Sequence, residues 1–178
     1  MSQSATIRPA QPGDVPAIVG LMHSYMQEAY GDIWHGSADA LAKDGFGHEF
    51  DIQVAASSCD GGLCGLVAWT RAYDFHHCMA GGEIIDMFVT PAVRGRSIGP
   101  LLVCAVAAEV HARGGLFLRG QAVKDRAVRR LYERVAVTAM TIECTISGRA
   151  FRTLSKLAGG TAKDVARRLP DRTWNYEA

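Results

Sequence analysis

The sequence has no paired cysteines, no long apolar run and almost no net charge, and each absence excludes a class of protein. Its 5 cysteines are odd in number and form no Cys-x-x-Cys pair, which argues against a disulfide-stapled fold or a closed zinc site and favours a reducing compartment. The longest uncharged apolar stretch, residues 97–108, is too short to cross a bilayer, and no apolar signal region follows Met1. We therefore expect a cytoplasmic protein with no membrane partner.

Two common phosphate-binding motifs, Gly-x-x-x-x-Gly-Lys-Ser/Thr and Gly-x-Gly-x-x-Gly, are also missing. The formal net charge is only +1, but it is unevenly distributed, with 3 Lys/Arg against 11 Asp/Glu in residues 1–90 and 16 against 7 in residues 91–178. A cationic ligand would favour the first half and a polyanion the second, unless the charges merely lie on separate solvated faces. The 178 residues, 48% of them hydrophobic, are enough for one sizeable core.

The pattern of apolar residues and turns predicts an α+β fold, with strands first and then alternating helix and strand over a mixed sheet. Asp14 and Ser37 are the expected caps of two early helices, and Asp60-Gly61 is the expected hairpin turn between two strands. Further strands are expected at residues 83–89, 115–123 and 139–146, and helices at residues 99–113 and 125–135. Two short helical segments, residues 148–159 and 161–170, end the sequence.

The stretch VTPAVRGRSIGPLL, residues 89–102, joins the end of a strand to the start of a helix. The first N–H groups of a helix have no intrahelical partner, and glycine lets an anion approach the backbone. Arg94 and Arg96 add charge-assisted donors. The stretch therefore predicts a pyrophosphate site, with a solvated helix cap as the alternative.

The same stretch resembles the acyl-CoA signature of the GCN5-related N-acetyltransferase (GNAT) family, with Arg94, Ser97 and Gly99 at its three defined positions. Residues 6–22 resemble the family's opening strand and helix, and residues 125–137 its later Leu-Tyr-Glu segment. The resemblance covers about residues 5–147. It implies a GNAT fold, in which helices flank both faces of a mixed central sheet that splays between the fourth and fifth strands. It also implies acetyl transfer from acetyl-CoA to a primary amine, by direct attack in a ternary complex, without a metal.

By this resemblance, the backbone near Met87 and Val89 would bind the pantetheine arm and polarise the thioester carbonyl. The cofactor-binding residues that it implies are Met87, Phe88, Val89, Arg94, Gly95, Arg96, Ser97, Ile98, Gly99 and Asp125. The sequence departs from the family pattern at several positions, among them Val128 in place of alanine and Ala136-Val137 in place of Gly-Phe. Ser97 replaces a glycine, Asp125 replaces an asparagine, and Pro100 removes a backbone N–H near the phosphates.

Tyr132 aligns with the tyrosine that protonates the leaving CoA thiolate in many family members, and its alternative role is packing on the sheet. Glu83 and Asp86 are both candidates for the general base. Their odd separation places them on opposite faces of a strand unless a β-bulge intervenes. His76 and His77 form a third candidate base. A metal site made from these histidines and Cys78 is disfavoured because adjacent residues on a strand point apart, so we expect no metal.

The acceptor is expected to be a small-molecule or peptide amine. The family builds its acceptor site largely from the first two helices and the third and fourth strands, a stretch that is acidic here and suits a cationic amine. We expect residues 1–148 to form the acetyltransferase domain. Residues 149–178 would form a basic helical extension, packed on or swapped from that domain, with a homodimer interface or RNA contact as alternatives. Two other functions stay open, a non-catalytic acyl-CoA-binding regulatory module and an RNA-directed acetyltransferase.

Overall fold

The computed structural model describes residues 5–121, 146, 148–158, 161 and 167–168. The chain forms two units, residues 1–137 and residues 138–178, which we describe separately. The described residues of the first unit form the sheet and three α-helices, and those of the second include helix α5 (Gly148–Lys156). The expected domain boundary at residues 148/149 remains a prediction.

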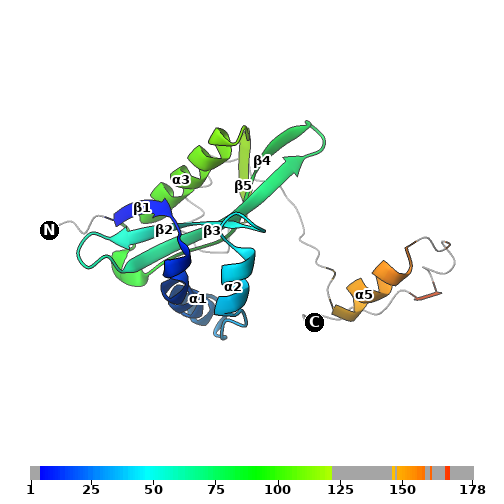
Figure 1. Ribbon diagram of the computed structural model, residues 1–178, viewed down its shortest axis with the longest axis horizontal. Helices are drawn as coiled ribbons and strands as arrows, with labels where there is room; N and C mark the ends of the chain where they lie inside the picture. Colours follow the sequence, from blue (N-terminus) through cyan, green and yellow to red (C-terminus); the bar gives the residue numbers. More distant parts are fainter. Residues whose placement is uncertain (1–4, 122–145, 147, 159–160, 162–166, 169–178) are drawn as a thin grey trace. The chain divides into compact units, whose positions relative to one another are not determined.

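Within residues 5–121, the first unit is built on a mixed sheet of five strands in the order β1-β2-β3-β4-β5 (Figure 1). The strands are β1 (Ala5–Pro9), β2 (Asp51–Ser57), β3 (Leu63–Asp74), β4 (Met79–Val89) and β5 (Phe117–Gly120). The first four are antiparallel neighbours, and β5 runs parallel to β4. The predicted hairpin joins β2 to β3, and Gly61 in its turn has a φ of 72°, a left-handed conformation that glycine adopts without strain.

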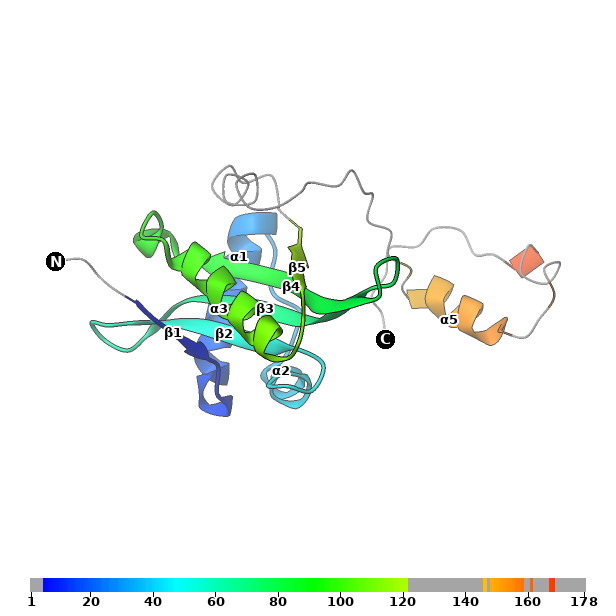
Figure 2. The same cartoon turned by 90° about the horizontal axis from the view of Figure 1, so that it is seen from above.

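Helices cover both faces of this sheet, as the two views in Figures 1 and 2 show. Helices α1 (Val15–Tyr30) and α2 (Ala38–Asp44) pack on one face, and α3 (Ile98–Ala112) packs on the other. Short 3-10 turns, η1 (Pro12–Asp14) and η2 (Pro91–Val93), precede α1 and α3. The predicted mixed-sheet α+β architecture is therefore confirmed.

Each face has its own apolar core, and each core follows from the spacing of apolar residues along a helix. Helix α3 buries every fourth residue from Ile98 to Val110, a stripe that matches one helical face. The core under α3 contains Ala55, Cys64, Val67, Trp69, Ile84, Val93, Ile98, Leu102, Val106 and Val110. The core under α1 and α2 contains Val15, Ile18, Leu21, Leu41, Ile52, Val54, Leu66 and Phe88.

The structure confirms one of the two predicted helix caps. The Ser37 hydroxyl accepts a hydrogen bond from the backbone N–H of Ala40 at 3.1 Å, as expected of a cap. Asp14 does not cap α1 with its side chain, because it already has helical backbone angles as the last residue of η1. Its carboxylate instead forms an ion pair with Arg8 at 2.7 Å, which is the main cause of its lowered pKa.

In the second unit, α5 matches the first of the two predicted C-terminal helical segments. The helix includes Arg149, Arg152 and Lys156. Most of the second segment, and the strand and helix expected within residues 122–145, lie outside the described residues. No helix in the described ranges of either unit is long and apolar enough to cross a bilayer.

Candidate active site

The loop between η2 and α3 has the geometry of an anion-binding turn. Gly95 and Ser97 both have left-handed backbone angles, with φ of 77° and 61°. The first helical bond of α3 joins the Leu101 N–H to the Ser97 carbonyl, so the N–H groups of Ile98 and Gly99 precede the helical bonding pattern. A Cβ added to Gly95 or Gly99 would meet no atom within 4 Å. The loop therefore offers donors and open space to a phosphate, although Pro100 supplies no donor.

Arg94 ties this loop to the neighbouring strand and helix. Its Nε donates to the Val89 carbonyl at 2.9 Å, and its two terminal nitrogens bind the two carboxylate oxygens of Glu28, in α1, at 2.7 and 2.8 Å. The guanidinium also lies over the Phe88 ring, 5.6 Å from its centroid. Arg94 thus connects the loop to α1 and β4, a contact that residue spacing alone did not predict. Arg96 is exposed in the same loop.

Strands β4 and β5 part beside this loop. They pair only from Gly81 with Phe117 to Ile84 with Gly120, whereas β4 continues to Val89 with β3 as its partner. In the described part of the chain, the β5 side of β4 therefore has no strand partner after Ile84. The Phe88 side chain is buried in the α1 core. An extended ligand arm at this edge would therefore meet the main chain of residues 87–89 rather than the Phe88 ring.

A β-bulge changes the orientation of the two candidate base residues. Trp69 pairs with Ile84 but Ala68 pairs with Asp86, so Ile85 is the extra residue on β4. Glu83 lies opposite Thr70, and Asp86 lies opposite Ala68 two residues away on β3, so both carboxylates face the same side of the sheet. This is the side covered by α1. The expectation of opposite faces, which assumed a regular strand, is therefore wrong for this strand.

The two carboxylates have different surroundings. Glu83 accepts hydrogen bonds from Arg119 of β5 at 2.7 and 3.0 Å. Asp86 accepts one from the Tyr25 hydroxyl at 2.9 Å and, among the described residues, has no ion-pair partner. Burial raises the pKa of Asp86, and the Tyr25 hydrogen bond offsets part of that rise. Asp86 thus lies in a partly buried, largely uncharged setting, whereas Glu83 is engaged by a guanidinium.

The family model for the acetyltransferase (GNAT) family matches residues 21–136, about two thirds of the chain. The chain belongs to the GNAT family. Members of this family use acetyl-CoA. No curated protein matches the sequence.

Solved structures of low sequence identity share the GNAT fold. A ribosomal-protein-alanine N-acetyltransferase from Brucella melitensis biovar Abortus 2308 is 22% identical, with a TM-score of 0.65 over 82% of this chain and 99% of that one. An aminoglycoside acetyltransferase from an uncultured soil metagenomic sample is 19% identical, with a TM-score of 0.66 over 82% and 99%. A transcriptional regulator from Bacillus halodurans C-125 is 22% identical, with a TM-score of 0.65 over 81% and 99%. At these identities the likeness establishes the GNAT fold alone.

Two of the residues implied by the GNAT resemblance, Asp125 and Tyr132, lie outside the described residues. Their assignments to acetyl-CoA binding and to thiolate protonation remain predictions. The described part of the site comprises the loop, the β4 edge after Ile84 and the two carboxylates. No local sequence pattern indicated the contact between Tyr25 and Asp86, because 61 residues separate them along the chain.

His76 and His77 lie in the turn of the β3–β4 hairpin, not on a strand as expected. Their backbone N–H groups donate to Asp74, and the His77 ring binds the same carboxylate at 2.9 Å. About 23 Å of extended strand separates this turn from Asp86. The histidines are therefore too far away to serve as the base of this GNAT site. The described residues contain no group of three His, Cys, Asp or Glu side chains that could hold a metal.

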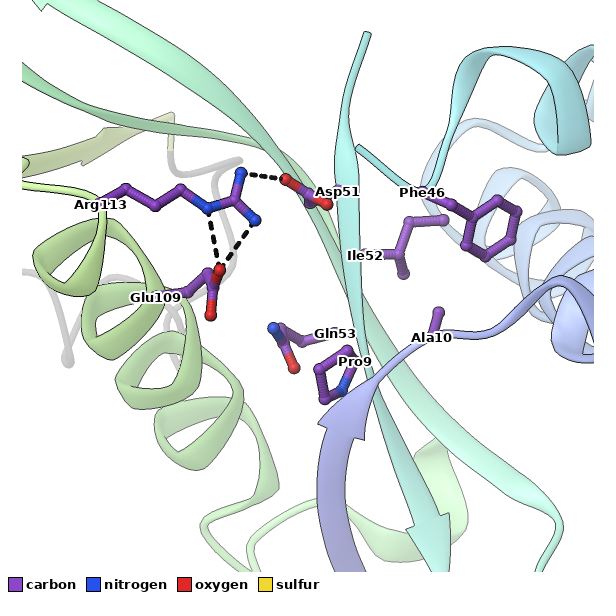
Figure 3. Close-up of a pocket in the computed structure, with 8 residues that line it drawn as sticks. All are labelled: Pro9, Ala10, Phe46, Asp51, Ile52, Gln53, Glu109 and Arg113. Carbon is purple, nitrogen blue, oxygen red and sulfur yellow. Dashed lines mark hydrogen bonds and ion pairs between the residues drawn. The ribbon is translucent and has the colours of Figure 1, made fainter. Parts of the chain in front are cut away.

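A cavity of about 210 Å³ lies at the C-terminal end of α3 (Figure 3). Arg113 reaches across its rim and bonds Glu109 and Asp51, and the buried Gln53 lies beside it. The loop is at the other end of this helix, whose 15 residues span about 22 Å. The cavity is therefore separate from the candidate site. Its walls comprise Pro9, Ala10, Phe46, Asp51, Ile52, Gln53, Glu109 and Arg113.

Proposed function

We propose that the protein transfers an acetyl group from acetyl-CoA to a primary amine, with Asp86 as the general base. The observation that supports this most directly is the β4 bulge, because it sets a partly buried carboxylate beside the edge where β4 leaves β5. Asp86 is preferred to Glu83 because Arg119 already occupies the Glu83 carboxylate in an ion pair, whereas Oδ2 of Asp86 has no hydrogen-bond partner among the described residues.

In this proposal, the loop from Arg94 to Gly99 binds the pyrophosphate, and the backbone of Met87 to Val89 binds the pantetheine arm and the thioester carbonyl. The open space at Gly95 and Gly99 supports the first contact, and the absence of a described β5 partner for residues 85–89 supports the second. Backbone donors placed at the carbonyl would stabilise the negative charge that develops on its oxygen.

The reaction needs three proton transfers. Asp86 takes a proton from the acceptor ammonium, and the neutral amine attacks the thioester carbonyl carbon. A C–N bond forms, the C–S bond breaks, and the CoA thiolate leaves with its electron pair. We assign protonation of that thiolate to Tyr132, on the strength of the family motif, since the ordinary pKa values of a thiol and a phenol, about 8.5 and about 10, are close. The nitrogen of the new amide then gives up its remaining extra proton, which restores the Tyr132 phenol.

We propose that the acceptor is a cationic amine. The first half of the sequence, with 3 Lys/Arg against 11 Asp/Glu, would attract such a substrate. The names of two structural neighbours, a ribosomal-protein-alanine N-acetyltransferase and an aminoglycoside acetyltransferase, also describe amine substrates. These names motivate a panel of a polyamine, an aminoglycoside and a peptide with N-terminal alanine.

The first test is thermal unfolding with acetyl-CoA, free CoA and ATP. Ligand at a hundredfold excess over Kd adds about 2.7 kcal/mol, which corresponds to roughly 5 to 11 °C for a chain of this length. We expect that shift with acetyl-CoA and free CoA but not with ATP. Equal shifts with all three, or no shift, would contradict the proposed acetyl-CoA site.

The second test is thiol release from acetyl-CoA with each amine of the panel, using Asp86→Asn as the paired variant. We expect wild-type turnover with at least one amine and a loss of about 100-fold or more in the variant.

A second candidate is a non-catalytic acyl-CoA-binding module. The left-handed Ser97 at a position where the family has glycine favours it, as does a neighbour named as a transcriptional regulator. It predicts the same thermal shifts, no turnover on the whole panel, and no effect of Asp86→Asn on acetyl-CoA binding.

A further inference from the structure

Tyr25 occupies the place where helix α1 meets the proposed base. It lies near the C-terminal end of the helix and is partly buried, with its ring packed on Phe88 at a centroid distance of 5.7 Å. Its hydroxyl lies 2.9 Å from Oδ1 of Asp86. The ring contact fixes where the hydroxyl points, because Phe88 is itself buried in the core under α1 and α2.

The direction of the Tyr25–Asp86 hydrogen bond follows from the proton affinities of the two groups. Burial, the nearby Tyr30 hydroxyl and the Asp86 carboxylate all raise the pKa of Tyr25, so the phenol keeps its proton. Tyr25 is therefore the donor, and Asp86 is the acceptor through one oxygen. The other oxygen, Oδ2, forms no hydrogen bond with the described residues.

The charged and titratable groups around this pair are few, and each has its own partner. On α1, Glu28 binds Arg94 of the loop. On β4, Glu83 binds Arg119 of β5. The β3 residue opposite Asp86 is Ala68, which does not ionise. Among the described groups, Tyr25 is thus the one that acts directly on the Asp86 carboxylate.

We propose that Tyr25 is a positioning residue that holds Asp86 as the base, engaging Oδ1 and leaving Oδ2 for the acceptor ammonium. This inference rests on the proposed acetyltransferase function. The hydrogen bond stabilises the carboxylate against its burial, so that the base remains ionised at a lower pH than it would alone. It also fixes the carboxylate plane relative to the β4 edge.

The test compares Tyr25→Phe with wild type, and uses Tyr73→Phe as the matched control. Tyr73 lies on β3 with 55% of its surface exposed, and loses the same hydroxyl group. Tyr25→Phe keeps the ring that packs on Phe88, so the fold should be retained. Carbon-13 NMR of the labelled carboxyl groups follows the titration of Asp86 in the free protein, with Asp86→Asn to assign its signal.

We expect the Asp86 titration midpoint to rise by about one pH unit in Tyr25→Phe, a tenfold change in proton affinity, and not to move in Tyr73→Phe. The acidic limb of kcat/KM for the amine should move upward by the same amount, with KM for acetyl-CoA unchanged. A purely structural tyrosine would lower the melting temperature without moving either pH midpoint.

An unmoved Asp86 titration in Tyr25→Phe overturns the inference whether or not the protein is an active enzyme. A titration that moves while the acidic limb of kcat/KM stays in place also overturns it, because Asp86 would then not be the base. Failure of the proposed function gives a different result. Wild type would then transfer acetyl to no amine, although Tyr25 could still shift the Asp86 titration.

Discussion

Replacing Ser97 by glycine should stabilise the protein. Ser97 has a φ of 61° and a ψ of 15° at the start of α3, and its side chain makes no capping hydrogen bond there. A left-handed conformation costs a residue with a Cβ about 1–2 kcal/mol, whereas the extra freedom of glycine in the unfolded chain costs roughly 0.5–1 kcal/mol. The difference predicts that Ser97→Gly raises the free energy of unfolding by about 0.5–1 kcal/mol. No cap is lost to offset this gain.

Urea unfolding followed by circular dichroism measures this difference, and thermal melts should show a rise of roughly 1 to 4 °C. Ser97→Ala is the matched control, because it removes the hydroxyl but keeps the Cβ, and its stability should stay within about 0.5 kcal/mol of wild type. Gly95→Ala, at a φ of 77°, should lose about 1 kcal/mol or more. If Ser97→Gly is no more stable than Ser97→Ala, the assignment of backbone strain to this residue is refuted.

Three further predictions concern charged side chains. Asp86→Asn should melt at or above the wild-type temperature at pH 7, because the amide oxygen can still accept from Tyr25 without a partly buried charge. Folding raises the pKa of Asp86, so its ionisation lowers the stability of wild type as the pH rises above the ordinary aspartate range. Melts between pH 4 and 8 should show this loss of stability in wild type and not in the variant. Folding lowers the pKa of Asp14, so wild type should lose stability as the pH falls below about 4. Asp14→Asn should lack that loss and cost no more than about 1 kcal/mol at pH 6, which melts at pH 3 and 6 would check. Arg113→Met should lower the free energy of unfolding by about 1–2 kcal/mol, because it removes two ion pairs and a guanidinium 4.9 Å from the centre of the Trp69 ring. An unchanged midpoint of urea unfolding would show that these contacts do not stabilise the fold.

Local patterns predicted most of the described fold. The Ser37 cap, the Asp60-Gly61 hairpin turn and the apolar stripe of α3 depend on neighbouring residues, so the sequence contains the information that they need. Asp14 is a residue for which the local pattern gave the wrong prediction. Its residue type suits a cap, but the ion pair with Arg8 and the 3-10 turn determine what its carboxylate does.

The sequence by itself determined the family, through the loop from Arg94 to Gly99 and the segments around it, because that motif depends on residue order. It also identified two carboxylates on the fourth strand as candidates for the base. Only the tertiary structure put both on one face, because an extra residue in one strand of a pair reverses the alternation that a sequence pattern assumes. Only the tertiary structure brought Tyr25 to Asp86 and Glu28 to Arg94, since both contacts join α1 to positions more than 60 residues away. Such contacts depend on how the helix packs across the sheet, and local sequence patterns do not predict that packing.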